Sequence, residues 1–317
     1  MSTRTDACPF EQGRFEDLPE RPRVPHPYYD AETHDVVVDS QPFGRARIHV
    51  VTYGAPDKPP LLLVHGLMTT SYSWRYMLEP LADRHRLVIP DLPGCGRSEP
   101  VPERRCTAAA LAAFIGEFQR ALDIEGCQTV GNSLGGYVCL LRALQDSASF
   151  ERLSVLHPPT HATPRTIGLH AGMRVPGIPQ ILSRLVRRDP LRWAHGNIHY
   201  YDESLKSLEE AREYGEPLAS AAGAGSFLRY LRDSLGPREQ HALSDELKLR
   251  RDAREPFPMA LQIVYASEDP TVPPKTGRSL HALIPQAEYH CLDRTSHFMQ
   301  VDSPDRLAAL LTTFLHG

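Results

Sequence analysis

The G-x-S-x-G pattern at residues 131–135, centred on Ser133, constrains the fold of this chain more than any other segment. A β-prone run at residues 128–130 precedes it, and residues 137–144 have the apolar composition of a buried helix. A strand that turns sharply into a helix exposes the serine at the turn as a nucleophile. So tight a turn needs small neighbours, which the glycines provide. The pattern also predicts that the Leu134 N–H, at the start of the helix, faces the place where an oxyanion would form.

A serine in this position depends on two partners. Its hydroxyl is a weak nucleophile unless a base accepts the proton and a third group orients the base. In an open α/β sheet such groups lie on loops at the carboxyl ends of the strands. Asp269 follows a predicted strand at residues 260–265, and His297 follows another at residues 288–291. The sequence therefore predicts a site composed of Ser133, Asp269 and His297.

Predicted strands and helices alternate along most of the chain. The continuous apolar run at residues 61–64 is typical of a strand buried on both faces of a parallel sheet. Residues 45–53 instead alternate polar and apolar, as a half-exposed antiparallel strand does. We expect an α/β fold in which a mostly parallel eight-stranded sheet has helices on both faces and a helical cap. The predicted strands are residues 35–39, 45–53, 61–64, 86–89, 128–130, 153–156, 260–265 and 288–291. The predicted helices outside the cap are residues 72–82, 108–122, 137–144 and 304–315.

This alternation divides the chain into three parts. Residues 1–34 are rich in proline and charge and lack periodicity, which predicts an N-terminal arm that lies on the surface or is partly disordered. Residues 35–157 and 256–317 form the predicted core domain. Residues 158–255 contain only helical segments interrupted by proline and glycine, and they form the predicted cap.

Composition restricts the partners and the cellular setting. The chain has 317 residues and a formal net charge of −4, which gives no electrostatic basis for binding nucleic acid. Its six cysteines lack C-x-x-C spacing, which favours a reducing compartment over disulfides or a zinc site. Residues 1–20 lack the apolar segment of a signal peptide, and apolar runs such as residues 108–115 are too short to span a bilayer. We therefore expect a cytoplasmic protein with no integral membrane segment; the sequence does not indicate its oligomeric state.

Five segments, in order, resemble the capped α/β-hydrolases over residues 35–317. They are L-V-H-G-L at 63–67 (the oxyanion turn), S-Y-S-W-R at 71–75 (the helix that follows), D-L-P-G-C-G-R-S at 91–98 (the D-x-x-G-x-G-x-S loop), the G-x-S-x-G elbow, and the Asp269 loop with the run at 296–304. The chain order of Ser133, Asp269 and His297 is also the order found in this family.

The resemblance implies a serine hydrolase that cleaves an ester-like bond of a small molecule through an acyl-enzyme. The bond would belong to a carboxylic ester, a lactone or a thioester, and neither a cofactor nor a metal is implied. Ser133 would attack the acyl carbonyl, His297 would accept its proton and later protonate the leaving group, and Asp269 would orient His297. The backbone N–H groups of Leu67 and Leu134 would form the oxyanion hole, with Met68 as an alternative donor.

Other members of this superfamily use different chemistry. The segments at 71–75 and 297–300 are similar to those of haloalkane dehalogenases and epoxide hydrolases, but these enzymes use an aspartate nucleophile where this chain has Ser133. Dehalogenases also have a tryptophan where this chain has Leu134. The meta-cleavage C–C hydrolases have Gly-Pro-Gly after H-G, where residues 67–70 here are L-M-T-T. A C–C bond hydrolase, a cofactor-free haloperoxidase-like enzyme and a non-catalytic ligand-binding protein remain alternatives.

Glu268 competes with Asp269 as the acid of the site. Either carboxylate could orient a histidine, and the resemblance favours Asp269. Asp293 is expected to cap or solvate its own loop. In some relatives the acid follows the strand that here ends at Leu156, but residues 157–159 are His-Pro-Pro and contain no carboxylate.

One segment of the predicted cap has an apolar stripe at helical spacing. Its members are Ile178, Ile181, Leu182, Leu185 and Val186. The simplest interpretation is an amphipathic helix packed on the core. A second is an apolar wall over Ser133 that binds a medium or long acyl chain, and a third is a lid that docks on a membrane surface. Six arginines and a single acid between residues 165 and 192 favour anionic substrates.

His195 and His199, four residues apart, have the spacing of a pair of metal ligands on a helix. The chain has 15 histidines, so this spacing alone does not indicate a metal site.

Overall fold

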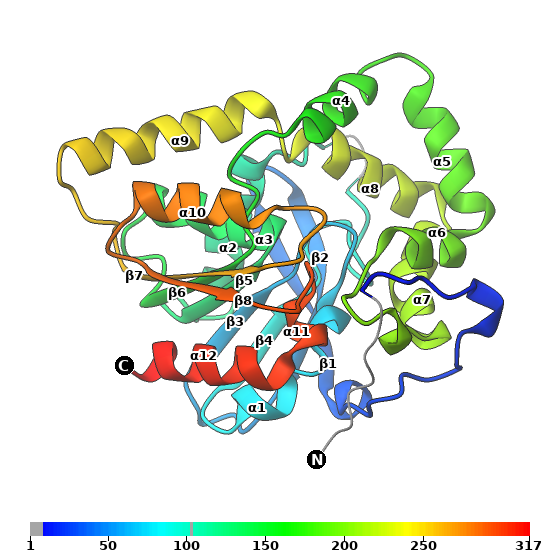
Figure 1. Cartoon of the computed structure of the whole chain (residues 1–317), viewed down its shortest axis with the longest axis horizontal. Coiled ribbons are helices and arrows are strands. Elements are labelled where there is room, and N and C mark those ends of the chain that lie inside the picture. Colours follow the sequence, from blue (N-terminus) through cyan, green and yellow to red (C-terminus); the bar gives the residue numbers. More distant parts are fainter. Residues whose placement is uncertain (1–8, 102–103) are drawn as a thin grey trace.

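Eight strands form one sheet in the computed structural model, which describes residues 9–101 and 104–317 (Figure 1). The strand order is β1-β2-β4-β3-β5-β6-β7-β8. The pairs β1–β2 and β2–β4 are antiparallel, and the other pairs are parallel. The strands are β1 Glu32–Ser40, β2 Gly44–Tyr53, β3 Pro60–Val64, β4 Arg86–Pro90, β5 Gln128–Asn132, β6 Arg152–Leu156, β7 Ala260–Ala266 and β8 Glu288–Leu292. The predicted eight-stranded, mostly parallel sheet is confirmed.

Helices cover both faces of this sheet. The helices are α1 Leu78–Ala82, α2 Ala108–Ala121, α3 Leu134–Gln145, α4 Pro164–Gly172, α5 Ile178–Arg188, α6 Pro190–Asn197, α7 Leu208–Gly215, α8 Ala221–Asp233, α9 Pro237–Asp252, α10 Pro274–Leu283, α11 Met299–Asp302 and α12 Pro304–His316. Among the residues that the structure describes, no helix is both long and apolar enough to cross a lipid bilayer.

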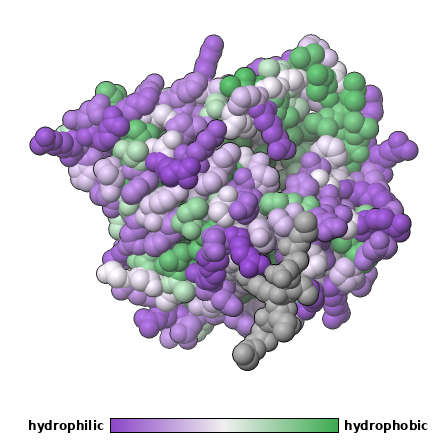
Figure 2. Space-filling model, viewed as in Figure 1, coloured by the Kyte–Doolittle hydropathy of each residue, from purple (hydrophilic) through white to green (hydrophobic). Residues whose placement is uncertain are grey.

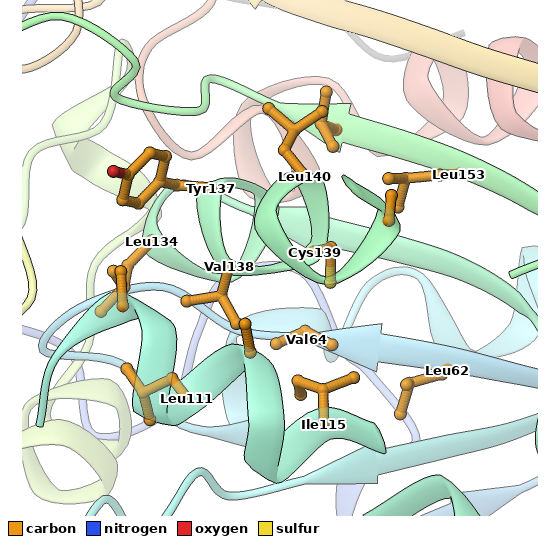
Figure 3. Packing of buried hydrophobic residues seen from close by; sticks show 14 of the residues in the cluster. Leu62, Val64, Leu111, Ile115, Leu134, Tyr137, Val138, Cys139, Leu140 and Leu153 are labelled. Carbon is orange, nitrogen blue, oxygen red and sulfur yellow. The ribbon is translucent and has the colours of Figure 1, made fainter. Parts of the chain in front are cut away.

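Strand β3 shows how the core is divided between the two faces. Leu62 and Val64 pack with α2 and α3 on one face (Figure 3), whereas Leu61 and Leu63 pack with α1 and α12 on the other. All four side chains are fully buried. Successive side chains of a strand point to opposite faces, so a strand buried on both faces must be apolar at every position.

The predicted helix over residues 72–82 is confirmed only in its last part. The structure has a 3-10 turn at Ser71–Trp74, and α1 begins only at Leu78. The Thr70 side chain accepts a hydrogen bond from the Tyr72 N–H (3.2 Å) and starts the tighter turn. Helix α10 lies between β7 and β8, where the sequence analysis predicted no helix.

Helices α4 to α8, which we call the helical region, stand over one end of the core at the right of Figure 1. Helix α9 leads back to the sheet. Leu243 and Leu247 of α9 belong to the same buried cluster as Leu153 of β6 and Leu280 of α10. The division into a core and a cap of residues 158–255 stays a prediction. Within it, α9 packs on the core side.

The N-terminal arm, from residue 9 onward, lies along the surface of the helical region. Its backbone pairs with the start of α7: the Leu208 N–H donates to the Pro19 carbonyl (2.9 Å). The Glu209 N–H donates likewise to the Glu20 carbonyl (3.1 Å). Tyr28 of the arm is buried in the core, and β1 begins at Glu32, within the last residues of the predicted arm. Cys8 and the start of the predicted arm lie outside the described residues.

Candidate active site

Ser133 stands between β5 and α3 in a backbone conformation that few residues adopt, with φ 52° and ψ −119°. Its N–H donates to the carbonyl of Leu156 at the end of β6 (2.7 Å), and its carbonyl accepts from the Tyr137 N–H (3.0 Å). The neighbouring strand and the first turn of α3 therefore hold the strained residue in place. The hydroxyl makes no hydrogen bond to any of the residues described by the structure.

Glycines around Ser133 are required by close packing. A Cβ at Gly135 would lie 2.4 Å from the Val64 carbonyl oxygen, and a Cβ at Gly131 would lie 2.7 Å from the Cα of Gly136. Real Cβ atoms do not come so close to backbone atoms. The spacing of the motif therefore follows from how tightly α3 approaches β3 and β5.

Asp269 and His297 meet at the same edge of the sheet. Asp269 follows β7 and His297 follows β8, and His297 Nδ1 lies 2.6 Å from Asp269 Oδ2. Asp269 Oδ1 accepts from the N–H groups of Thr271 (2.7 Å) and Val272 (2.8 Å), which fix the carboxylate. With Nδ1 bonded to Asp269, the Nε2 atom of His297 is left to accept a proton.

The structure adds His157 to these predicted residues. His157 follows β6, has φ 48°, and is fully buried. Its Nδ1 lies 3.0 Å from Asp269 Oδ2, at a bent angle, and its ring centre is 5.1 Å from that of His297. Ser133, His157, Asp269 and His297 thus follow the successive neighbours β5, β6, β7 and β8. In the sequence, this loop was notable only for its lack of a carboxylate.

Burial and charge set the protonation of this group in opposite directions. Burial favours the neutral acid, but the charge of His297 and the contact with His157 outweigh it, so the pKa of Asp269 lies well below its usual value. For His157 burial is the larger effect and lowers the pKa, although Asp269 acts to raise it. Asp269 is therefore a carboxylate at neutral pH, and His157 is a neutral imidazole that can donate one N–H.

The oxyanion turn after β3 is held by His65. Its Nδ1 lies 2.8 Å from the Gly66 carbonyl oxygen, and its Nε2 accepts from the Leu92 N–H (2.9 Å). His65 is fully buried and shapes this turn. Leu67 follows it, and Leu134 is the first residue of α3, where helix N–H groups have no intrahelical acceptor. A Cβ at Gly66 would lie 3.0 Å from the Cβ of Ser133, so the turn that carries Leu67 borders the elbow.

The D-x-x-G-x-G-x-S loop has a structural role. Asp91 accepts hydrogen bonds from the backbone N–H groups of Ser71 (2.7 Å) and Arg97 (2.8 Å). A Cβ at Gly96 would lie 2.2 Å from Asp91 Oδ2, so only glycine fits. The Ser98 hydroxyl donates to the Asp91 carbonyl (2.7 Å) and closes the loop.

A cavity of about 30 Å³ adjoins the oxyanion turn. Leu67 and Met68 line it from the core, and Tyr214, Leu218 and Phe227 line it from the helical region. A space of this size holds about one water molecule. Neither Ser133 nor His297 lines this cavity, which is too small for an acyl group as it stands.

The predicted substrate residues on α5 do not lie at this cavity. Ile178, Ile181 and Leu185 are 40%, 56% and 53% exposed and point into solvent. Leu182 is half-buried and packs inward in a cluster with Val186. The stripe is too wide for one buried face, and its exposed half has no partner within the described residues.

The competing candidates are placed elsewhere. The Glu268 side chain is exposed, and Asp293 pairs with Arg306 on the surface. His195 Nε2 lies 3.1 Å from the Gly13 carbonyl oxygen of the arm, and His199 Nδ1 lies 3.2 Å from Glu203 Oε1. These contacts use the two histidines in packing and surface pairing.

One group of three possible metal ligands occurs in the described part of the chain: His157, Asp269 and His297. Both imidazoles lie on one oxygen of Asp269, at 2.6 and 3.0 Å. Metal–ligand bonds to these atoms are about 2.0–2.2 Å long and converge on a shared centre. The geometry is that of a carboxylate hydrogen-bonded to His297, with the ring of His157 beside the same oxygen.

Comparison with known proteins places these features in a family. A sequence model of the alpha/beta hydrolase fold matches residues 59–304. The chain is 25% identical over 259 residues to a 2-hydroxymuconate semialdehyde hydrolase of Pseudomonas sp. (strain CF600), covering 81% of this chain and 86% of that one. It is 29% identical over 272 residues to haloalkane dehalogenase 2 of Mycobacterium bovis, covering 84% and 91%.

A solved structure shows the same fold. The thermophilic esterase from Thermogutta terrifontis superposes with a TM-score of 0.67 at 19% identity, over 90% of this chain and 98% of its own. The proteins similar to this chain thus include one named as a semialdehyde hydrolase, one named as a dehalogenase and one named as an esterase. The choice between them depends on the residues of the site.

Proposed function

The chain belongs to the alpha/beta hydrolase fold family, and from that premise we propose that it is a serine hydrolase that cleaves an ester-like bond of a small molecule through an acyl-enzyme. The observation that carries the proposal is the hydrogen bond from His297 to buried Asp269, at the sheet edge where the strained Ser133 follows β5. This arrangement supplies a nucleophile, a base and the group that orients the base.

In the proposed reaction the Ser133 hydroxyl attacks the acyl carbonyl while His297 Nε2 takes its proton. The negative charge moves to the carbonyl oxygen, where the N–H groups of Leu67 and Leu134 stabilise it, each by about 3–4 kcal/mol. The intermediate collapses, His297 protonates the departing alcohol or thiol, and an ester to Ser133 remains. Water, deprotonated by His297, then releases the acid and restores the hydroxyl.

The nucleophile separates this chain from some of its relatives. The resemblance to dehalogenases implies an aspartate at the elbow, and this chain has Ser133 there. Carbon–carbon bond hydrolysis is the second candidate, because relatives of this chain are named as a 2-hydroxymuconate semialdehyde hydrolase and a meta-cleavage product hydrolase. It would use the same three residues and differ in the substrate.

The test is labelling with a fluorophosphonate probe followed by assays on a substrate panel. We expect the probe to modify Ser133, and Ser133→Ala to lose both labelling and about 10³-fold or more of kcat. Ser279→Ala, a change at an exposed serine of α10, should retain both. A folded protein that is not labelled would exclude the serine hydrolase.

The substrate panel identifies the class of bond that the enzyme hydrolyses. It contains p-nitrophenyl esters of graded acyl length, lactones, thioesters and 2-hydroxymuconate semialdehyde. Turnover of the esters with none of the semialdehyde supports the proposal. The reverse result selects the C–C hydrolase while leaving the triad assignment intact.

A further inference from the structure

Exposed apolar side chains gather on α4, α5 and the turn between them. Of the ten large apolar residues that are exposed among the described residues, six lie in this segment: Ile167, Leu169, Val175, Ile178, Ile181 and Leu185. Figure 2 shows apolar surface at the upper right, where α4 and α5 lie in Figure 1. We call these six residues the apolar ridge. A contiguous exposed patch of this kind marks an interaction site.

The surroundings of the apolar ridge are strongly basic. Arg165, Arg184 and Arg188 are exposed and form no ion pair with any described residue. Between residues 165 and 192 the only acid is Asp189, which pairs with Arg192 (2.9 Å). The ridge is thus bordered by cationic groups that lack neutralising partners.

A groove between α5 and α8 adds to this charge. It has a volume of about 350 Å³ and is lined by Arg184, Arg187, Arg229 and Arg232. Asp233 pairs with Arg232 (2.8 Å), which leaves the other three guanidinium groups to attract anions. Guanidinium groups bind phosphate oxygens through paired N–H donors.

We propose that the apolar ridge docks this protein on the surface of an anionic lipid bilayer, with Ile181 and Leu185 among the acyl chains and the arginines at the headgroup phosphates. An amphipathic helix with apolar residues on one face and arginines beside them binds the interface in this way, lying in its plane. Helix α5 has this arrangement, since Arg184 and Arg188 flank Leu185.

A second copy of the chain fits the ridge less well. A two-fold contact through α5 would bring each copy's arginines against those of its partner, because such an interface uses the same patch on both subunits. Asp189 is the single acid there, and it is already paired. Charge complementarity therefore selects an anionic surface.

The docked face adjoins the cavity at the oxyanion turn through α8. Leu228 and Arg229 of α8 line the groove, whereas Phe227 and Tyr230 line the cavity at the oxyanion turn. Helix α8 therefore separates the bilayer surface from the cavity. The docking itself is independent of catalysis and does not rest on the proposed function.

The test is co-sedimentation of the full chain with vesicles. We expect binding to vesicles that contain phosphatidylglycerol, binding to phosphatidylcholine vesicles that is weaker by about tenfold or more, and loss of binding at high salt. Ile181→Ser with Leu185→Ser, and separately Arg184→Glu with Arg188→Glu, should each reduce binding by about tenfold or more.

A matched control is Leu249→Ser with Arg278→Glu. Leu249 on α9 is 72% exposed and Arg278 on α10 is exposed, so these changes repeat the chemistry away from the ridge. They should leave binding unchanged. Equal binding to both kinds of vesicle, equal loss in the control, or no vesicle binding would overturn the proposal. A dimer that the Ile181→Ser, Leu185→Ser variant dissociates would assign the ridge to a second copy of the chain instead.

Discussion

Ser133 occupies a backbone conformation that is about 1–3 kcal/mol less favourable than an ordinary one. It persists because contacts with neighbouring elements fix the backbone on both sides of the residue. Its N–H is fixed by the Leu156 carbonyl, and the chain turns directly into α3. Gly135 permits this turn, because any Cβ there would meet the Val64 and His65 carbonyl oxygens. The strained conformation of Ser133 therefore depends on the close contact between α3 and β3.

Gly135→Ala tests this dependence. The new methyl group would lie 2.4 Å from a carbonyl oxygen, so we expect a loss of about 3 kcal/mol or more in the free energy of unfolding, or no folded protein. Gly168→Ala is the control. Gly168 lies in α4 with nothing within 4 Å of its Cβ position, and alanine there should stabilise by up to about 1 kcal/mol. Denaturant titration measures both, and equal effects would refute the packing argument.

His157 is expected to be a positioning residue for Asp269. His157→Phe removes the polar ring nitrogen that lies 3.0 Å from the buried Asp269 carboxylate. Loss of such a contact costs about 1–3 kcal/mol, so kcat should fall about 10- to 100-fold with KM nearly unchanged. His157→Gln, which retains a donor, should restore part of the rate. If both variants lose activity equally, or KM alone changes, His157 does not act through Asp269.

The same variant makes a pH prediction with a definite sign. Burial lowers the pKa of folded His157 below its ordinary value of 6.5, so below that pH the unfolded chain binds a proton that the folded chain does not. His157 therefore reduces stability as the pH falls through about 6.5. As the pH falls through this range, the natural protein should lose stability relative to His157→Gln. Above this range the difference in stability between the two should not change with pH. A constant difference at every pH would contradict the assignment.

Sequence reasoning reached Ser133, Asp269 and His297 because each follows a strand and belongs to a recognisable segment. It missed His157 for a physical reason. The contact between residues 157 and 269 depends on β6 and β7 being neighbours, which no local pattern encodes, and a neutral histidine does not resemble the missing carboxylate.

At the scale of elements, the 3-10 turn Ser71–Trp74 joins the core to the helical region. Arg75, directly after this turn, is fully buried and pairs with Glu210 of α7 (2.7 Å). Its guanidinium carbon lies 4.5 Å from the ring centre of Tyr72 and 4.7 Å from that of Tyr76. The Tyr200 hydroxyl also donates to Glu210. One buried charge pair thus fixes α7 relative to the sheet.

Removing either partner of this pair leaves the other charge buried. We expect Arg75→Met and Glu210→Met each to reduce the free energy of unfolding by about 3–5 kcal/mol. The double variant should recover much of that loss, because neither charge remains. A double-mutant cycle by chemical denaturation measures the coupling, and additive losses would show that the pair is not coupled.

The strands were predictable because alternating or continuous apolar residues report the burial of a sheet directly. The helix over residues 72–82 was not, since its composition favours a helix and the observed turn is set by contacts from elsewhere in the chain. The side chain of Asp91, twenty residues away, accepts a hydrogen bond from the Ser71 N–H and fixes the start of the buried turn.

At the scale of the whole molecule, the N-terminal arm crosses from the helical region to the core. It pairs with α7 through backbone hydrogen bonds and ends at buried Tyr28, whose hydroxyl lies 2.8 Å from Ser71 Oγ. His26 also contacts Glu209 of α7 (2.9 Å). The sequence left the position of the arm open, because proline and charge carry no periodicity.

Deleting residues 1–22 tests the arm. We expect faster hydrogen exchange in α6 and α7, which lose backbone partners, and little change in β3 and β5 at the centre of the sheet. Arg14→Ala is the control, because it breaks an exposed pair with Asp17 and leaves the backbone contacts intact. Unchanged exchange in α7 after the deletion would show that the arm contributes nothing to the order of that helix.

The arm also bears on how the helical region can move relative to the core. The helical region is joined to the core by the segment after β6, by the segment before α9, and by the arm with its return to Tyr28. Two connections alone would allow the helical region to rotate as a rigid body about the axis that joins them. The arm is a third connection and restricts this rotation. We therefore expect small molecules to enter the cavity at the oxyanion turn through local rearrangement of side chains such as Phe227 and Tyr214. The helical region as a whole should stay in place.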